Sequence, residues 1–239
     1  MICPMSEVKI DRRFCGPAQS ANGGYSCGLL AAEIGGPAEV TLRVPPPLGR
    51  PLLRQVREDG SAVLLDGKAV VAEARTTTLE GSVPAPVTRD QATRASQRYE
   101  WIDEHPYPCC FVCGPERDPG DGLRIFPGPV EGRELYACTW TPEESLGDGS
   151  GSVRPEFVWA ALDCPSGIVT DRFGEIGMVL LGRLAVELLE PVPSGEICVL
   201  TAWTVGREGR KLDTGSALFA ADGNLLASSR ARWIELREH

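Results

Sequence analysis

Asp163 stands alone in an otherwise apolar run, "FVWAALDCPSG". A carboxylate in such a run is paired, exposed at an edge or functional, because burying it without a partner costs free energy. The residues alone leave two interpretations open. The side chain is either satisfied by a nearby backbone N–H or arginine, or it acts as a general base or nucleophile. Asp163 is therefore the first candidate catalytic residue.

Asn22, Gly23 and Gly24 form a second candidate group, at the start of "NGGYSCGLLAAE". One interpretation is a hairpin turn, for which Asn-Gly is the strongest short signal. The other is a helix with Asn22 as N-cap and glycines that leave its first N–H groups accessible. Because "YSCGLLAAE" does not alternate as a strand would, the helix is favoured. Its N–H groups would stabilise an oxyanion, with Tyr25 beside them as a substrate-binding residue.

A third group, "HPYPCCFVC", places His105 near Cys109, Cys110 and Cys113. Four zinc ligands within nine residues, two of them adjacent, would strain a tetrahedral site, and no second Cys-x-x-Cys is present. A redox role is weaker still, because no helix start follows. Serine–histidine catalysis is also poorly supported, since the only other histidine is His239 and no Gly-x-Ser-x-Gly motif exists. We predict no metal and no cofactor.

Composition limits the partners. The 239 residues carry a net charge of -9, which argues against a nucleic-acid-binding face. No apolar run reaches the roughly 18–20 residues of a membrane helix, so no membrane partner is expected. Nine cysteines without a signal-peptide pattern predict reduced thiols in a cytoplasmic protein. Arg207, Arg210 and Lys211 would either meet the phosphates of a ligand or form a solvated basic turn.

The elements that must position these residues occur twice. Val40–Arg75 and Val186–Arg232 each begin with an alternating strand, turn through a proline-rich bend and end in an Asp-Gly hairpin, at Asp66 and at Asp222. The second copy has a longer middle hairpin through "GREGRKL".

A helix is predicted before each copy. The first spans about residues 23–34 and the second about residues 155–170, where Pro165 predicts a kink or break just after Asp163.

We therefore expect an α+β fold with two curved antiparallel sheets, each wrapped around a central helix and joined into one pseudo-dimer. The expected divisions are residues 1–83 for the first repeat, 84–108 for a linker with a short helix near 88–99, and 109–239 for the second repeat.

Three motifs resemble the hotdog-fold thioesterase superfamily in its tandem, double-hotdog form. "CFVCGPERDPGDGL" resembles the Cys-Phe-x-Cys-Gly…Asn-Pro-x-Gly-Leu opening of phenylacetyl-CoA-type thioesterases, with Asp118 where the family often has Asn. "RPEFVWAALDCPSG" resembles their His-Gly-Gly helix, with Asp163 at the catalytic acid. "ANGGYSCGLL" resembles the glycine start of the same helix.

The resemblance implies that each half is defective in the opposite way. The first half keeps the glycines, with Asn22 for His, but has Ala31 where the acid should fall. The second half keeps Asp163 but has Arg154-Pro155-Glu156 in place of His-Gly-Gly. Since the family builds its site between two hotdog units, one composite site per chain is expected, from Asn22–Gly24 and Asp163.

The implied activity is hydrolysis of an acyl-CoA or related thioester. The alternatives are a non-catalytic acyl-CoA or lipid-binding hotdog protein and, less favoured because no histidine lies near a candidate helix, a hydratase or dehydratase. The expected partners are a CoA-like small molecule and, through sheet edges or faces, a second copy in a homodimer of double hotdogs.

Overall fold

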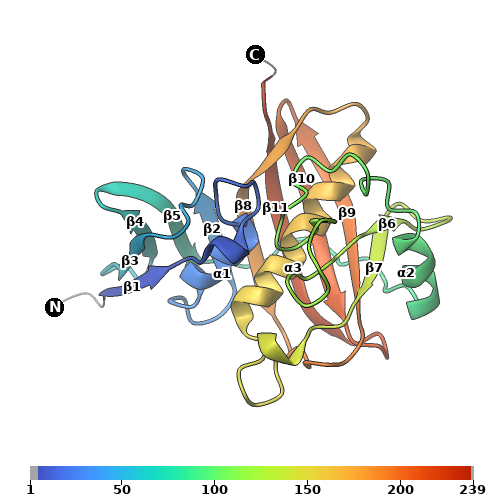
Figure 1. The fold of residues 1–239 in the computed structure, drawn as a ribbon, viewed down its shortest axis with the longest axis horizontal. Coiled ribbons are helices and arrows are strands. Elements are labelled where there is room, and N and C mark those ends of the chain that lie inside the picture. The colour runs from blue at the N-terminus through green and yellow to red at the C-terminus, as the bar shows by residue number, and fades with distance from the viewer. Residues whose placement is uncertain (1–4, 238–239) are drawn as a thin grey trace.

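The computed structural model describes residues 5–237 as one long antiparallel sheet with two helices, α1 and α3, packed against each other beside it (Figure 1). The helices are α1 (Gly23–Ala31), α2 (Arg89–Ser96) and α3 (Pro155–Ile168), with short 3-10 helices η1 (Arg12–Phe14), η2 (Glu144–Leu146) and η3 (Val169–Phe173). The strands are β1 (Met5–Lys9), β2 (Ala38–Leu42), β3 (Pro51–Val56), β4 (Ala62–Asp66), β5 (Ala69–Thr76), β6 (Gly128–Pro129), β7 (Tyr136–Trp140), β8 (Val179–Leu188), β9 (Cys198–Glu208), β10 (Lys211–Phe219) and β11 (Leu225–Glu235).

The strand order repeats from the centre of the sheet outward. The full order is β1-β3-β4-β5-β2-β8-β11-β10-β9-β7-β6. Read outward from the centre, β2-β5-β4-β3-β1 on one side corresponds to β8-β11-β10-β9-β7 on the other. Each half thus has the same five-strand topology, as the repeated sequence pattern indicated.

The two expected sheets are joined edge to edge. Strand β2 pairs with β8, from Ala38 opposite Val186 to Thr41 opposite Arg183, and this pairing joins the halves into one 11-stranded sheet. The edge of each half would otherwise present unpaired backbone N–H and C=O groups. Mutual pairing satisfies these groups without any special side chain.

The predicted hairpins are confirmed. Gly67 and Gly223 have positive φ angles of 58° and 90°, in the turns between β4 and β5 and between β10 and β11. The longer hairpin joins β9 to β10 through Gly209.

Helix α1 begins at Gly23, and the Asn22 side chain accepts a hydrogen bond from the Tyr25 N–H at 2.8 Å. The N-cap interpretation is therefore confirmed, and the hairpin-turn alternative is wrong. The helix ends at Ala31, three residues before the predicted end.

The predicted break at Pro165 is absent, because α3 continues through the proline to Ile168. Pro165 has no N–H to donate to Ala161 O. Two hydroxyl groups donate to the next two carbonyls of the helix, Ser216 Oγ to Leu162 O at 2.7 Å and Ser166 Oγ to Asp163 O at 2.6 Å.

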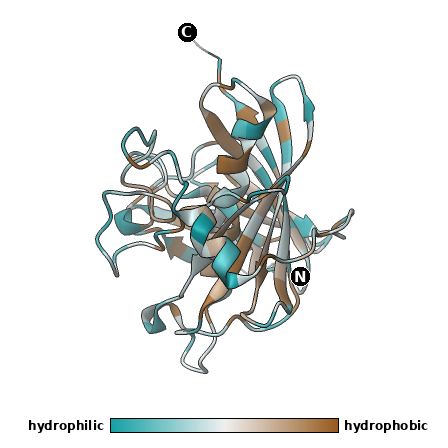
Figure 2. Cartoon of the chain, turned by 90° about the vertical axis from the view of Figure 1, so that its right-hand side faces the viewer, coloured by the Kyte–Doolittle hydropathy of each residue, from teal (hydrophilic) through white to brown (hydrophobic). Residues whose placement is uncertain are grey.

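A short helix, α2, lies within the segment predicted as a linker, and Thr88 and Gln91 form a capping box at its start. It packs against β7, and Figure 2 shows its outer side as hydrophilic. Within residues 5–237, none of the helices combines the length and apolarity needed to cross a membrane.

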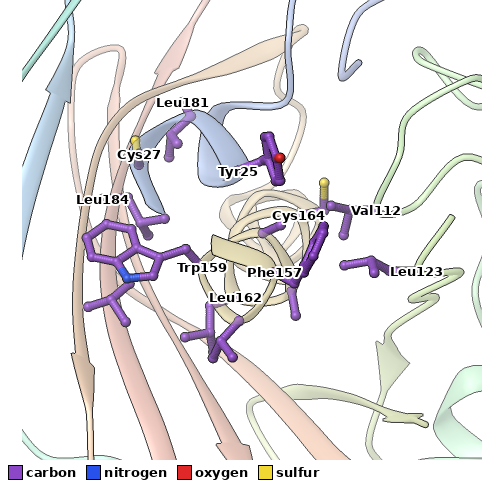
Figure 3. Packing of buried hydrophobic residues seen from close by; sticks show 14 of the residues in the cluster. Tyr25, Cys27, Val112, Leu123, Phe157, Trp159, Leu162, Cys164, Leu181 and Leu184 are labelled. Atoms are coloured by element: carbon purple, nitrogen blue, oxygen red, sulfur yellow. The ribbon is translucent and has the colours of Figure 1, made fainter. Parts of the chain in front are cut away.

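The core is continuous between the two halves. Figure 3, a view along α3, shows Tyr25 and Cys27 of α1 beside Phe157 and Trp159 of α3. Gly24 lies against Asp163 and Gly28 lies against Glu156. The two helices therefore run in opposite directions. The N-terminus of α1, from the first half, therefore lies against the middle of α3, from the second half.

Candidate functional site

The residues singled out in the two halves meet at the start of α1. Asp163 Oδ2 accepts a hydrogen bond from the Gly24 N–H at 2.8 Å and a second from Asn22 Nδ2 at 2.9 Å. The same Asn22 side chain caps α1 through its Oδ1 atom. A carboxylate from α3 thus lies at the N-terminus of α1, where the helix dipole favours negative charge.

Close helix packing explains why Gly24 lacks a side chain. An added Cβ would lie 2.7 Å from Trp159 O and would also overlap the Asp163 Cβ. At Gly23 an added Cβ would lie 2.8 Å from Leu181 Cδ2. Gly24 is buried and Gly23 only half-buried, so Gly23 is the more accessible of the two.

Asp163 is only 2% exposed, and its second oxygen, Oδ1, has no hydrogen-bond partner among residues 5–237. Burial raises the pKa of Asp163 to about 7. The Gly24 N–H and the Asn22 amide act in the opposite direction, and the negative charge of Cys110 acts in the same direction as burial.

Tyr25, the third residue of α1, lies in an aromatic cluster. Its ring stacks on Phe14 with 4.3 Å between ring centroids, and it also contacts Phe157 and Phe111. The residue is 7% exposed, and burial, with Glu156 adding to it, raises its pKa to about 12. Its main visible role is packing between α1, η1 and α3.

The mirror position differs as the sequence indicated. Arg154 is the N-cap of α3, makes no side-chain cap hydrogen bond and lies over the Phe157 ring, 4.6 Å from its centroid. Pro155 is the first residue of α3, and Arg154 pairs with Glu156 at 3.7 Å. Ala31, at the end of α1, offers no carboxylate there.

The basic residues proposed for phosphates lie apart from these groups in the chain, at the β9–β10 hairpin. Arg207 pairs with Glu235 at 2.9 Å, and Arg210 donates to the Glu235 carbonyl at 3.1 Å. Lys211 lies 3.5 Å from Glu208. No contact joins them to Asp163 among the hydrogen bonds of the described residues.

The cysteine group includes a residue that the local spacing did not reveal. Cys164 of α3 lies beside Cys110 and Cys113, and the Cys110 and Cys164 sulfurs are 3.7 Å apart. Cys109 instead faces Cys15, also at 3.7 Å. No local sequence signal links Cys164 to the other two, because only the packing of the loop on α3 brings the sulfurs together.

These thiols affect one another. Hydrogen bonds from the thiols of Cys113 and Cys164 lower the pKa of Cys110 well below the usual range, and the bond with Cys110 raises the pKa of Cys164. The eight cysteines within residues 5–237 are free thiols, while Cys3 and His239 lie outside the described residues.

Burial lowers the pKa of His105, whose Nδ1 accepts a hydrogen bond from the Tyr107 N–H at 2.9 Å.

The fold is shared with solved structures over almost the whole chain. A proposed thioesterase II from Thermobifida fusca aligns with a TM-score of 0.63 and 16% identity, over 98% of this chain and 92% of that one. A proposed thioesterase from Novosphingobium aromaticivorans aligns with a TM-score of 0.64 and 11% identity, over 98% and 96%.

A protein of unknown function with a hot dog fold, from Alicyclobacillus acidocaldarius, aligns with a TM-score of 0.57 and 11% identity, over 98% and 94%. No protein-family model matches the sequence, and no curated protein matches it either. The resemblance read from the motifs is thus confirmed at the level of the fold: the chain has the hotdog fold of these structures.

Proposed function

We propose that the chain is a thioester hydrolase of double-hotdog form with one composite active site. Asn22, Gly23 and Gly24 come from the first repeat and Asp163 from the second. The observation that carries the proposal is the pair of hydrogen bonds from Gly24 and Asn22 to Asp163 Oδ2. The two neighbours in fold that are described as thioesterases support the reaction class.

We propose a role for each group. Asp163 Oδ2 is held by two donors, which leaves Oδ1 as the reactive oxygen. The N–H of Gly23, a half-buried residue at the positive end of α1, is the proposed donor to the thioester carbonyl oxygen. Negative charge that develops on that oxygen is stabilised there in the transition state.

Two routes lead to the same products. In the first, Asp163 Oδ1 takes a proton from water as the water oxygen adds to the carbonyl carbon; the C–S bond then breaks and the thiolate leaves with that proton. In the second, Oδ1 itself adds to the carbonyl carbon and expels the thiolate, and water hydrolyses the resulting anhydride. Both yield one carboxylic acid and one thiol.

Replacing Asp163 with Asn tests the proposal. The amide oxygen still accepts from Gly24 and Asn22, so the local structure is kept, but the base and nucleophile are lost. We expect kcat to fall about 10²–10⁴-fold on any acyl-CoA that the wild type hydrolyses, measured by thiol release. Asp171→Asn is the control: Asp171 is partly buried and lies outside this site, where it accepts a hydrogen bond of 2.9 Å from the Tyr136 hydroxyl. Unchanged turnover in Asp163→Asn would overturn the assignment.

Recognition of CoA is assigned to the β9–β10 hairpin. Arg210 and Lys211 are exposed at its tip, with Arg207 beside them. We expect the double variant Arg210→Glu, Lys211→Glu to raise KM for an acyl-CoA several-fold, because phosphate contacts would become repulsive. The N-acetylcysteamine thioester of the same acyl group lacks these phosphates, so its KM should not change. Equal KM changes for both substrates would place the CoA phosphates elsewhere.

A second candidate function is binding of an acyl-CoA or lipid without turnover. The near-complete burial of Asp163 and the occupation of the Gly24 N–H by its carboxylate favour this alternative. Ligand-induced stabilisation in a thermal-shift assay with no thiol release from any acyl-CoA would establish it.

A further inference from the structure

We propose that Cys110, Cys113 and Cys164 bind one thiophilic metal ion, Zn²⁺ or Cu⁺. Their sulfur atoms all lie within 4.8 Å of one another. The side chains are 2%, 4% and 8% exposed, so the three thiols converge inside the core. Buried thiolates from separate segments are the ligands that such soft ions prefer.

The spacing of the sulfurs suits metal coordination. With metal–sulfur bonds of about 2.3 Å, sulfurs around a tetrahedral ion are about 3.8 Å apart, and around a trigonal ion about 4.0 Å apart. Cys110 and Cys164 are already at 3.7 Å. The three sulfurs complete a trigonal Cu⁺ site, whereas Zn²⁺ would add a fourth ligand such as water.

The backbone fixes two of the three ligands before any ion binds. The loop that carries Cys110 and Cys113 is closed by a hydrogen bond from the Gly114 N–H to Cys110 O at 2.9 Å. An added Cβ at Gly114 would lie 2.6 Å from Cys110 N and would also overlap Pro108 O. Only glycine therefore permits this tight loop, and Phe111 N–H anchors it to Cys15 O at 2.7 Å.

Metal binding accounts for the third sulfur better than a disulfide does. A disulfide between Cys110 and Cys164 would leave Cys113 as an unpaired thiol against the bond. By contrast, the Cys15–Cys109 pair has the same 3.7 Å separation but belongs to no group of three ligands among the described residues. A bound ion would link the 110–114 loop to the turn of α3 that carries Asp163.

Native mass spectrometry tests the site without substrate. The full chain is incubated in reducing buffer with Zn²⁺ or with Cu⁺ and then washed with EDTA or bathocuproine, respectively. We expect one ion retained per chain in one of the two arms. Cys113→Ser and Cys164→Ser should lose it, and Cys138→Ser, which alters an equally buried thiol outside the group, should keep it.

A second measurement serves if the cluster variants fail to fold. Co²⁺ added to the wild-type chain should give a thiolate-to-cobalt charge-transfer band at one equivalent. The proposal is overturned if the wild type retains neither ion and shows no such band, if Cys113→Ser and Cys164→Ser retain the ion as well as the wild type, or if peptide mapping of the fresh, reduced protein finds a Cys110–Cys164 disulfide.

Discussion

Asn22 uses both ends of its amide at the junction of the two repeats. The oxygen caps α1 and the nitrogen donates to Asp163, so one side chain starts a helix in the first half and orients a carboxylate of the second. Aspartate at this position would cap the helix equally well but could not donate to Asp163 when ionised. The amide supplies the acceptor for the cap and the donor for the carboxylate on two separate atoms, Oδ1 and Nδ2.

Asn22→Ala should therefore cost more stability than the loss of a cap alone. The cap contributes about 1 kcal/mol, and a hydrogen bond to a buried carboxylate about 1.5–3 kcal/mol. We expect the free energy of unfolding in urea to fall by about 2–4 kcal/mol. Thr88→Ala removes only the cap of the exposed helix α2 and should cost about 1 kcal/mol. Equal losses for both variants would show that the Asn22–Asp163 bond adds nothing to stability.

Much of the candidate site could be predicted from residue types, because a lone carboxylate and paired glycines are unusual in helices. Their meeting was inferred from the resemblance and not from the residues alone. The sequence could not show that Cys164 joins Cys110 and Cys113, since 50 and more residues separate them and only the packing of the loop on α3 brings the sulfurs together.

At the scale of elements, α1 and α3 approach closely because glycines lie along one side of α1. Gly24 packs on Asp163 and Gly28 on Glu156, four residues and therefore about one turn apart. Glycine lowers the stability of the helix, and this cost is offset by contacts that form because the two backbones lie close together. That distance lets the Gly24 N–H reach Asp163 directly.

Gly24→Ala separates these two effects. Alanine should gain about 1 kcal/mol in helix propensity, but its Cβ would lie 2.7 Å from Trp159 O, and overpacking of this kind costs about 1–3 kcal/mol or more. Since the neighbour is backbone and cannot move aside, we expect net destabilisation in urea unfolding. Gly206→Ala in β9, where an added Cβ meets nothing within 4 Å, should be neutral or stabilising. A Gly24→Ala variant as stable as wild type would mean that the helices separate at little cost.

Local elements were largely predictable, because turn and cap chemistry is short-range. The Asn22 cap and the Asp-Gly hairpins depend on residues within a few positions of one another. Other features depend on contacts between distant residues. Against expectation, α3 continues through Pro165, and Ser216 on a strand donates to Leu162 O three residues before it. The join between the two sheets is made by β2 and β8, from different halves.

At the scale of the whole molecule, many contacts bind the halves to each other. Among them are the pairing of β2 with β8, the packing of α1 on α3 and the hydrogen bonds to Asp163. The covalent connection, by contrast, runs through residues 77–87, which form neither helix nor strand. We therefore expect the connection to raise the effective concentration of one half near the other, and to have little effect on how the two halves pack together.

Cutting that connection tests this view. A protease site inserted after the exposed Glu80 allows the folded chain to be cleaved. We expect the fragments to elute together in size-exclusion chromatography and to keep the thiol-releasing activity proposed above, because both contribute residues to the proposed site. Urea unfolding should become dependent on protein concentration, with about 2–3 kcal/mol lost at roughly 10 µM, since the tether supplies an effective concentration of about 1 mM. The uncut chain should show no such dependence. If the fragments separate in native buffer, the covalent connection itself is what holds the two halves together.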